Sequence, residues 1–255
     1  LFRICISIVI VILGVVGFFV LQYAYGQKLY DDTSIQVKAP VTVVDEVDSS
    51  ETAKQEPKPQ EKPSEVKKKL SNLSLEPVRK ESKNVRYWIY IPGTRINYPV
   101  MQAQNNSYYL HHSYKGKWLF SGSIFMDCSN KYDFTDFNTI IYGHHMNDGS
   151  MFAGLINYMN TSFAKSHPYI YLTRDGLTSV FQVFSTQQVG ATSYVYRANF
   201  DTDEEKQKYI DACLADSVID TGIVPKTNDH ILTLSTCTNR SGKQRWVVHA
   251  VMVSV

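Results

Sequence analysis

The end of the chain holds the feature that most constrains its fold, a pair of apolar, β-branched runs. Residues 231–237 read Ile-Leu-Thr-Leu-Ser-Thr-Cys and residues 245–253 read Arg-Trp-Val-Val-His-Ala-Val-Met-Val, with a polar, glycine-containing loop of seven residues between them. Such runs around such a loop predict a β-hairpin. Opposed residues of an antiparallel pair have Cβ atoms ~5 Å apart, so Cys237 and Arg245 are expected to meet at the mouth of the hairpin.

This predicted pairing sets a thiol beside a permanent cation. A neighbouring positive charge favours the thiolate, which is the nucleophilic form of cysteine. A guanidinium also suits an oxyanion. Because side chains alternate along a strand, Ser235 is expected on the same face as Cys237. A lone cysteine at a strand end is also commonly a small hydrophobe, so the rest of the chain has to decide between the two interpretations.

Short strands recur from Trp88 to the end of the chain, a length that suffices for one hydrophobic core. This density of short strands predicts a mainly β fold, as a closed or nearly closed barrel with flanking helices. The predicted strands are Tyr87–Ile91, Asn97–Gln102, Ser123–Asp127, Asn138–Tyr142, Tyr169–Thr173, Ser179–Ser185, Gln187–Tyr194, Ile231–Thr236 and Trp246–Val253.

Two helices are predicted between the strands. Ser150 is expected to cap a helix over Met151–Met159, whose apolar residues keep helical spacing. Thr202 with Glu205 resembles a capping box ahead of a helix over Lys206–Val218. Both apolar faces are expected to pack in the core. The second helix lies in a long excursion between strands, and such excursions often form substrate walls.

The first thirty residues predict a single transmembrane anchor. No charged residue occurs between Arg3 and Lys28, and Ile4–Leu21 is almost wholly apolar, close to the ~20 residues that a bilayer core requires. Tyr23 and Tyr25 suit the interface, and the short basic N-terminus predicts that it lies inside the cell and the rest of the chain outside. A cleavable signal peptide is the alternative, because an Ala-Tyr-Gly sequence follows the apolar run.

Residues 31–66 predict a spacer between the anchor and a folded domain over residues 67–255. The segment is rich in Lys, Glu, Pro, Ser and Thr, a composition typical of solvated, semi-extended chain. Residues 66–83 then predict either one helix or two short ones, because Pro77 interrupts a weak stripe of leucines.

Composition argues against two kinds of function. The formal charge is +2 and the basic residues are interspersed with acidic ones, so nucleic-acid binding is not expected. The four cysteines, at positions 5, 128, 213 and 237, lack the CxxC or CxxH spacing of a zinc site. No disulfide framework is implied, although one bridge involving Cys128 stays open. We expect neither a metal nor a cofactor.

A thiolate enzyme usually needs a proton carrier, most often histidine. His144 is the strongest candidate of the seven histidines, because it directly follows a predicted strand that ends at Gly143. His249 lies inside the last predicted strand and is expected to be a core or rim histidine, and the remaining histidines are expected at the surface. A metal site at His144 and His145 is not expected, since adjacent side chains diverge.

Here the chain resembles the sortase family. Thr233-Leu-Ser-Thr-Cys237 followed by Arg245 is similar to the specific sortase signature TLxTC with an arginine at the start of the next strand. Tyr142-Gly-His-His-Met146 resembles the histidine segment of class B sortases. Residues 87–94 (Tyr-Trp-Ile-Tyr-Ile-Pro-Gly-Thr) and 98–102 (Tyr-Pro-Val-Met-Gln) resemble an early block of that class. The likeness covers roughly residues 67–255.

The resemblance implies a sortase-type barrel of eight strands, with N-terminal helices and a long helix before the cysteine strand. It implies a membrane-anchored cysteine transpeptidase of a Gram-positive surface. In that family Cys237 would attack the Thr carbonyl of a C-terminal sorting motif, often Asn-Pro-x-Thr in class B, and pass the acyl group to an amine of a peptidoglycan precursor. His144 would be the general acid and base, Arg245 would hold substrate and oxyanion, and Ser235 would contact the substrate.

Several points stay open at this stage. Arg240 offers a second arginine in the hairpin loop, and Tyr194 and Tyr196 are candidates for lining the motif groove. A pilin lysine is an alternative acceptor. From other classes, a papain-like protease fits poorly, because its cysteine would begin a helix. An anchored binding domain without chemistry remains the other alternative.

Overall fold

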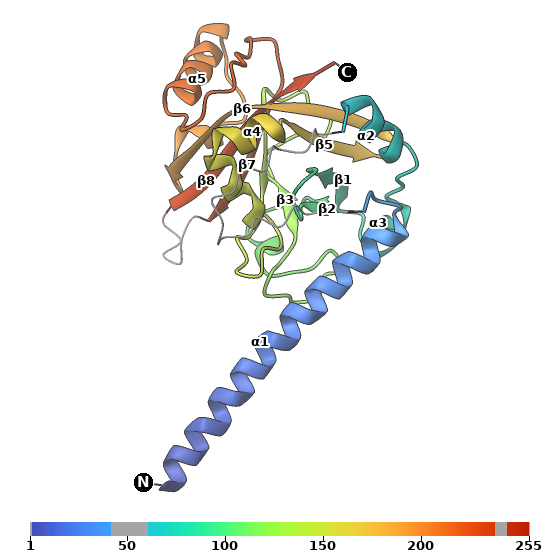
Figure 1. Cartoon of the computed structure of the whole chain (residues 1–255), viewed down its shortest axis with the longest axis vertical. Coiled ribbons are helices and arrows are strands. Elements are labelled where there is room, and N and C mark those ends of the chain that lie inside the picture. Colours follow the sequence, from blue (N-terminus) through green and yellow to red (C-terminus); the bar gives the residue numbers. More distant parts are fainter. Residues whose placement is uncertain (1, 42–60, 238–243, 255) are drawn as a thin grey trace.

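The computed structural model describes residues 2–41, 61–237 and 244–254, and its centre is a closed β-barrel of eight strands (Figure 1). The order around the barrel is β1-β2-β3-β4-β7-β8-β6-β5. The β2–β3 and β4–β7 pairs are parallel and the others are antiparallel. The strands are β1 (Val85–Tyr90), β2 (Asn97–Met101), β3 (Ile124–Met126), β4 (Asn138–Tyr142), β5 (Tyr169–Arg174), β6 (Leu177–Gly190), β7 (Ile231–Cys237) and β8 (Gln244–Val253). The predicted eight-stranded barrel is therefore confirmed.

Helices flank the barrel on several sides (Figure 1). The α-helices are α1 (Phe2–Gln36), α2 (Pro63–Leu70), α3 (Glu76–Glu81), α4 (Thr161–Ser166) and α5 (Asp203–Ala215). The 3-10 helices are η1 (Tyr108–Leu110), η2 (Ala153–Met159) and η3 (Tyr194–Tyr196). The open choice over residues 66–83 resolves into two short helices, with Pro77 in the first turn of α3, where its missing N–H has no intrahelical role.

Two predicted strands, Ser179–Ser185 and Gln187–Tyr194, are wrong as separate elements. Both belong to β6, which pairs with β8 along its length and shifts register between Val183 and Ser185. A shift of this kind bends a strand without ending it, so the two predicted segments form one continuous strand. Tyr194, placed at the end of a strand, begins η3 instead.

The helix expected over Met151–Met159 begins later and is a 3-10 helix. Met151 has a φ of 56°, in the left-handed region that a helix cannot contain. Ser150 does not cap it; its hydroxyl donates to the Asp148 carboxylate at 2.6 Å. By contrast, the predicted cap of α5 is confirmed, because the Glu205 amide donates to the Thr202 hydroxyl at 3.2 Å. That helix starts at Asp203 and ends at Ala215, three residues earlier at each end than predicted.

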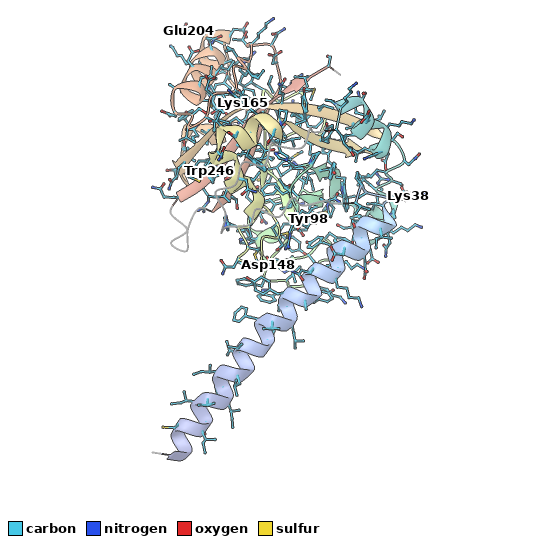
Figure 2. The ribbon with its side chains drawn as sticks, in the orientation of Figure 1. Lys38, Tyr98, Asp148, Lys165, Glu204 and Trp246 are labelled. Carbon is cyan, nitrogen blue, oxygen red and sulfur yellow. The ribbon has the colours of Figure 1, made fainter. Side chains whose placement is uncertain are left out.

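Helix α1 combines an exposed apolar half with an end that packs on the barrel domain. Its apolar segment is long enough to cross a membrane, with a mean hydropathy of 2.8, and projects away from the barrel with its side chains uncovered (Figure 2). The helix continues past residue 30, where we placed the end of the anchor. Leu29, Tyr30, Thr33 and Val37 are all buried against the domain. The described residues 31–41 thus cover the barrel domain, and the expected spacer over 42–60 lies outside the described residues.

Two layers of apolar side chains hold the barrel. The interior contains Ile141, Leu234 and Val248, which alternate with outward-facing neighbours along β4, β7 and β8. Outside the barrel, α5 contributes Tyr209 and Ile210 to a second cluster, which packs against β6, β7 and β8. The excursion between β6 and β7 therefore covers one outer face, and the ends of β4 and β7 emerge beside it.

Candidate active site

Three neighbouring strands bring the predicted catalytic positions to one edge of the barrel. In the parallel pair β4–β7, Tyr142 lies opposite Ser235, and the Gly143 amide continues the ladder by donating to the Ser235 carbonyl at 3.1 Å. In the antiparallel pair β7–β8, Cys237 lies opposite Arg245. His144 follows Gly143 directly. Positions 144, 237 and 245 therefore lie in a row, at neighbouring ends of the adjacent strands β4, β7 and β8. Arg240 lies outside the described residues.

The His144 ring is held in one orientation by a backbone group. Its Nε2 lies 2.7 Å from the carbonyl oxygen of Leu110, at the end of η1. A carbonyl only accepts hydrogen bonds, so Nε2 carries the hydrogen, and Nδ1 of the neutral ring is left as the proton acceptor. The His111 ring stacks on the same imidazole at a centroid distance of 5.8 Å. The histidine is thus prepared to act through Nδ1.

Burial lowers the pKa of His144 below its usual value of 6.5. The hydrogen bond to Leu110 opposes this effect, whereas the charges of His111 and Arg245 lower the pKa further. The Arg245 guanidinium lowers this pKa through its electric field, because β7 alone separates β8 from β4, the strand before His144. At neutral pH the ring is therefore neutral and able to accept a proton.

A chain of polar side chains supports the strand that carries His144. The Tyr142 hydroxyl donates to the Asp127 carboxylate at 2.9 Å, and the Asn106 amide donates to the same oxygen at 2.7 Å. Asn106 in turn accepts a hydrogen bond from the Cys128 amide at 2.8 Å. Three segments distant in sequence are thereby tied together at the end of β4.

The structure separates the two tyrosines proposed for the groove. Tyr196 lies beside the site, with its hydroxyl 2.9 Å from that of Ser235 and its ring 5.9 Å from that of Tyr142. Tyr194 points away from it, and its hydroxyl donates to the Asp216 carboxylate at 3.1 Å, beyond the end of α5. Only Tyr196 of this pair therefore contacts a residue of the cysteine strand by a described interaction.

A buried polar network fixes η3 against the strands. Gln187 donates to Nε2 of His249 at 3.2 Å, and Nδ1 of His249 lies 3.0 Å from the Thr233 hydroxyl. Thr233 donates to the Asn138 side-chain oxygen at 2.7 Å, and the Asn138 amide donates to the Val195 and Arg197 carbonyls, each at 3.0 Å. The predicted core role of His249 thus has a structural purpose, because the network positions the helix that carries Tyr196.

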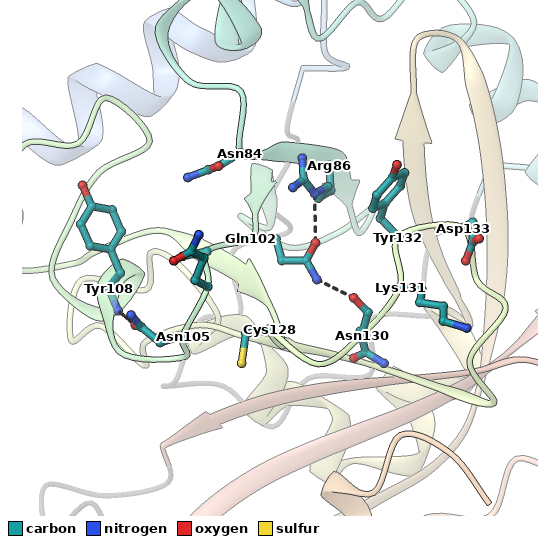
Figure 3. Close-up of a pocket in the computed structure, with 12 residues that line it drawn as sticks. Asn84, Arg86, Gln102, Asn105, Tyr108, Cys128, Asn130, Lys131, Tyr132 and Asp133 are labelled. Atoms are coloured by element: carbon teal, nitrogen blue, oxygen red, sulfur yellow. Dashed lines mark hydrogen bonds between the residues drawn. The ribbon is translucent and has the colours of Figure 1, made fainter.

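A polar cavity of about 790 Å³ lies near the site, between β1, β2 and the loops that follow β2 and β3 (Figure 3). Tyr108 and Asn105 lie at one end and Asp133 at the other, with Gln102 between them accepting from Arg86 at 3.0 Å. Neither His144 nor Arg245 lines this cavity. Its lining includes Cys128, the neighbour of Asp127.

Sequence reasoning missed the groups that position His144. The Leu110 carbonyl is a backbone acceptor and has no signature in the sequence. Tyr142 and Asn106 stand within or next to the segments that resemble class B sortases, and that position is the one signal that draws attention to them. Within the described residues, no cluster of three metal-ligating side chains occurs.

Comparison with known proteins identifies the family. A model of the sortase domain family matches residues 89–253. Sortase B of Listeria monocytogenes is 32% identical over 251 residues, which cover 97% of this chain and 96% of the relative. The chain belongs to the sortase family. The predicted membership and the predicted class of enzyme, a cysteine transpeptidase, are both confirmed.

Solved structures place this sortase in class B. A Staphylococcus aureus sortase B–substrate complex matches with a TM-score of 0.67 and 34% identity, over 71% of this chain and 85% of that one. Sortase B from B. anthracis matches with a TM-score of 0.72 and 30% identity, over 92% of this chain and 99% of that one. The greater coverage of the second match indicates that more than the barrel is shared.

Proposed function

We propose that this sortase cleaves a C-terminal sorting motif of surface proteins after Thr and transfers the protein to an amine of the cell wall. The observation that carries the proposal is the row of positions 144, 237 and 245 across β4, β7 and β8. In this proposal the row supplies a base, a nucleophile and a cation from three adjacent strands, which is the arrangement that acyl transfer to a thiol requires.

The first half-reaction forms the thioacyl-enzyme. His144 takes the thiol proton on Nδ1, and the Cys237 thiolate attacks the Thr carbonyl carbon. As the S–C bond forms, the π electrons of the C=O bond move onto the carbonyl oxygen, where the Arg245 guanidinium stabilises the negative charge. The intermediate then collapses with cleavage of the peptide C–N bond, and the leaving amine takes the proton from His144. A thioester to the Thr residue remains on Cys237.

The second half-reaction releases the product to an amine. The acceptor nitrogen attacks the thioester carbon, and the Cys237 sulfur leaves as thiolate when the C–S bond breaks. His144 accepts the proton that the amine loses, so the same Nδ1 serves both halves. The lowered pKa of His144 keeps it neutral for this step near neutral pH. The acceptor would be a peptidoglycan precursor.

The same proposal gives Ser235 and Tyr196 contacts with the motif. Their hydroxyls lie 2.9 Å apart, on the outer face of the strand that leads to Cys237. Each can turn its hydrogen bond from its neighbour to a peptide amide or carbonyl. Helix α1 would anchor the enzyme with its N-terminus inside the cell and the barrel outside, as the position of Arg3 indicates.

The test is the acyl mass on the enzyme. The full chain in detergent is incubated with peptides containing Asn-Pro-x-Thr and single substitutions of it, without an amine acceptor, and analysed by peptide mass spectrometry. We expect Cys237 to carry the part of the peptide that ends at Thr, removable by hydroxylamine. Cys128→Ala and Cys213→Ala should be acylated normally. Cleavage by the Cys237→Ala variant would overturn the proposal.

A further inference from the structure

A cluster of aromatic side chains remains exposed where the barrel domain meets α1. Residues 111–119 form a small hairpin in which His112 bridges Trp118 and the Leu119 amide donates to the His111 carbonyl. Leu119 is buried against α1, but Trp118 and Phe120 on either side of it are 47% and 36% exposed. A group of neighbouring aromatic side chains that stays exposed indicates a site of interaction with a membrane or with another protein.

These aromatics contact α1 at the upper end of its apolar segment. Trp118 lies 5.8 Å from Phe18 between ring centroids, and Phe120 lies 5.3 Å from Phe19 and 5.9 Å from Tyr23. Phe18 and Phe19 themselves remain 48% and 38% exposed. The five rings, four of them exposed and Tyr23 half-buried, therefore form one continuous surface shared by the helix and the domain.

The length of α1 sets the depth of this surface. A helix rises ~1.5 Å per residue, so Phe19 lies about 24 Å and Tyr23 about 30 Å beyond Arg3 along the axis. A bilayer core is about 30 Å thick. If Arg3 marks the inner boundary, Phe18 and Phe19 lie in the outer part of the core and Tyr23 at its outer boundary. Trp118 and Phe120, which contact them, lie at the same level.

From this geometry we propose that the hairpin of residues 111–119, with Phe120 directly after it, docks on the outer surface of the membrane through Trp118 and Phe120. Tryptophan favours the headgroup level, where its ring is apolar and its N–H is wet. Lys117 is the neighbour of Trp118 in the sequence, Lys28 follows Tyr23 by five residues along α1, and both are exposed, so both suit the phosphates of anionic lipids. The inference rests on the proposal that α1 spans the membrane.

Docking at two points would fix the barrel relative to the bilayer. The part of α1 that follows its apolar segment is hydrogen-bonded to the loop after His144. Gln27 donates to the Asp148 carboxylate at 3.1 Å. Figure 2 shows Asp148 and Tyr98 beside the helix. A domain held by α1 alone can tilt together with the helix in the bilayer, whereas a second contact at the membrane surface removes that freedom. The active edge is then held at a constant height above the lipids.

The tryptophans of the chain allow a direct test. Trp88 and Trp246 are 0% and 2% exposed, so Trp118 is the one tryptophan that a lipid quencher reaches. The full chain is reconstituted in vesicles of phosphatidylcholine and phosphatidylglycerol whose acyl chains carry bromine near the headgroup or near the methyl end. We expect the shallow bromine to quench Trp emission roughly twofold more than the deep one, since tryptophan settles at the interface.

Two variants serve as matched controls. In Trp118→Phe the difference between shallow and deep bromine should vanish, while an aromatic ring is kept at the site. Adding Val224→Trp to that variant places an exposed tryptophan in the segment after α5, far from the membrane, and its emission should be unquenched.

The outcomes separate this inference from the anchor on which it rests. Failure of the full chain to float with the vesicles overturns the anchor and the docking together. Flotation without shallow quenching of Trp118 overturns the docking and leaves the anchor in place. Equal quenching of Trp118 and of the tryptophan at position 224 also overturns it, because the contact would then be nonspecific.

Discussion

Two adjacent histidines follow β4, and the ring of the first is oriented by a hydrogen bond to a backbone carbonyl. The Leu110 carbonyl orients the His144 ring, and the charge of Arg245 lowers its pKa. His145 instead forms a backbone bridge with Met151. We predict that His144→Ala lowers the rate of acyl-enzyme formation by ~10²–10⁴. His145→Ala should cost far less. Single-turnover acylation measures both, with circular dichroism to check folding, and equal losses would contradict the assignment.

The register across β7 and β8 places Arg245 opposite the cysteine. Arg245 is the second residue of β8, a strand that pairs with both β6 and β7, so its backbone is ordered before the substrate arrives. We predict that Arg245→Ala lowers the acylation rate by roughly 10²–10³, the usual cost of losing an oxyanion donor. Arg245→Lys should recover little, because an ammonium lacks the planar fork.

Arg240→Ala is the matched control for this prediction. The same acylation assay should show a change of a few fold at most. A large loss in Arg240→Ala beside a near-normal rate in Arg245→Ala would reverse the two roles.

At the scale of elements, the sequence predicts what alternation and capping encode locally. The hairpin of β7 and β8 and the cap of α5 follow from side-chain patterns, and so do the positions of Cys237, His144 and Arg245. What it misses depends on distant parts of the chain. The positive φ of Met151 displaces the start of η2, and the register shift inside β6 lets one strand continue where two were expected. The Leu110 carbonyl lies 34 residues before His144 and carries no local signal.

The network that joins β6, β7, β8 and η3 makes stability depend on pH. Burial lowers the pKa of His249 from 6.5 to about 3, so the unfolded chain binds a proton between these values that the folded chain does not. The free energy of unfolding should therefore be unaffected above pH 6.5 and fall as the pH drops toward 3. The full difference amounts to at most about 5 kcal/mol.

His249→Gln should remove most of this acid dependence. The variant should also lose ~1–3 kcal/mol at pH 7, because its hydrogen bonds to Thr233 and Gln187 are not fully replaced. Urea unfolding at several pH values between 4 and 7 measures both effects, and His230→Gln, outside the network, provides the control. An unchanged slope in His249→Gln would show that other groups cause the acid loss.

At the scale of the whole molecule, α1 belongs to two environments. Its first half is apolar and uncovered, but Tyr30 donates to the Gly122 carbonyl at 2.6 Å and Thr33 lies 2.9 Å from the Tyr114 hydroxyl. The composition of residues 31–66 predicted a spacer because it favours solvation on average. An average over a segment does not reveal that a single helical face, with Tyr30, Thr33 and Val37, covers the barrel domain.

Truncation of the chain tests this second role of α1. A chain that begins at residue 24 keeps the packed end of the helix and loses most of the apolar half, whereas a chain that begins at residue 61 loses both. Burying one large apolar side chain contributes about 1.5–3 kcal/mol, and the packed end buries Leu29, Tyr30 and Val37.

We predict that both chains are soluble and fold. The shorter one should unfold at a midpoint lower by roughly 10–35 °C, since three such side chains contribute about 4.5–9 kcal/mol and 1 kcal/mol shifts a domain of this size by about 2–4 °C. Scanning calorimetry of the two proteins in the same buffer gives the comparison, with Tyr30→Ala in the longer chain as an intermediate case. Equal midpoints would mean that the end of α1 rests on the domain without stabilising it, and the folded unit would then begin after α1, as the predicted domain over residues 67–255 does.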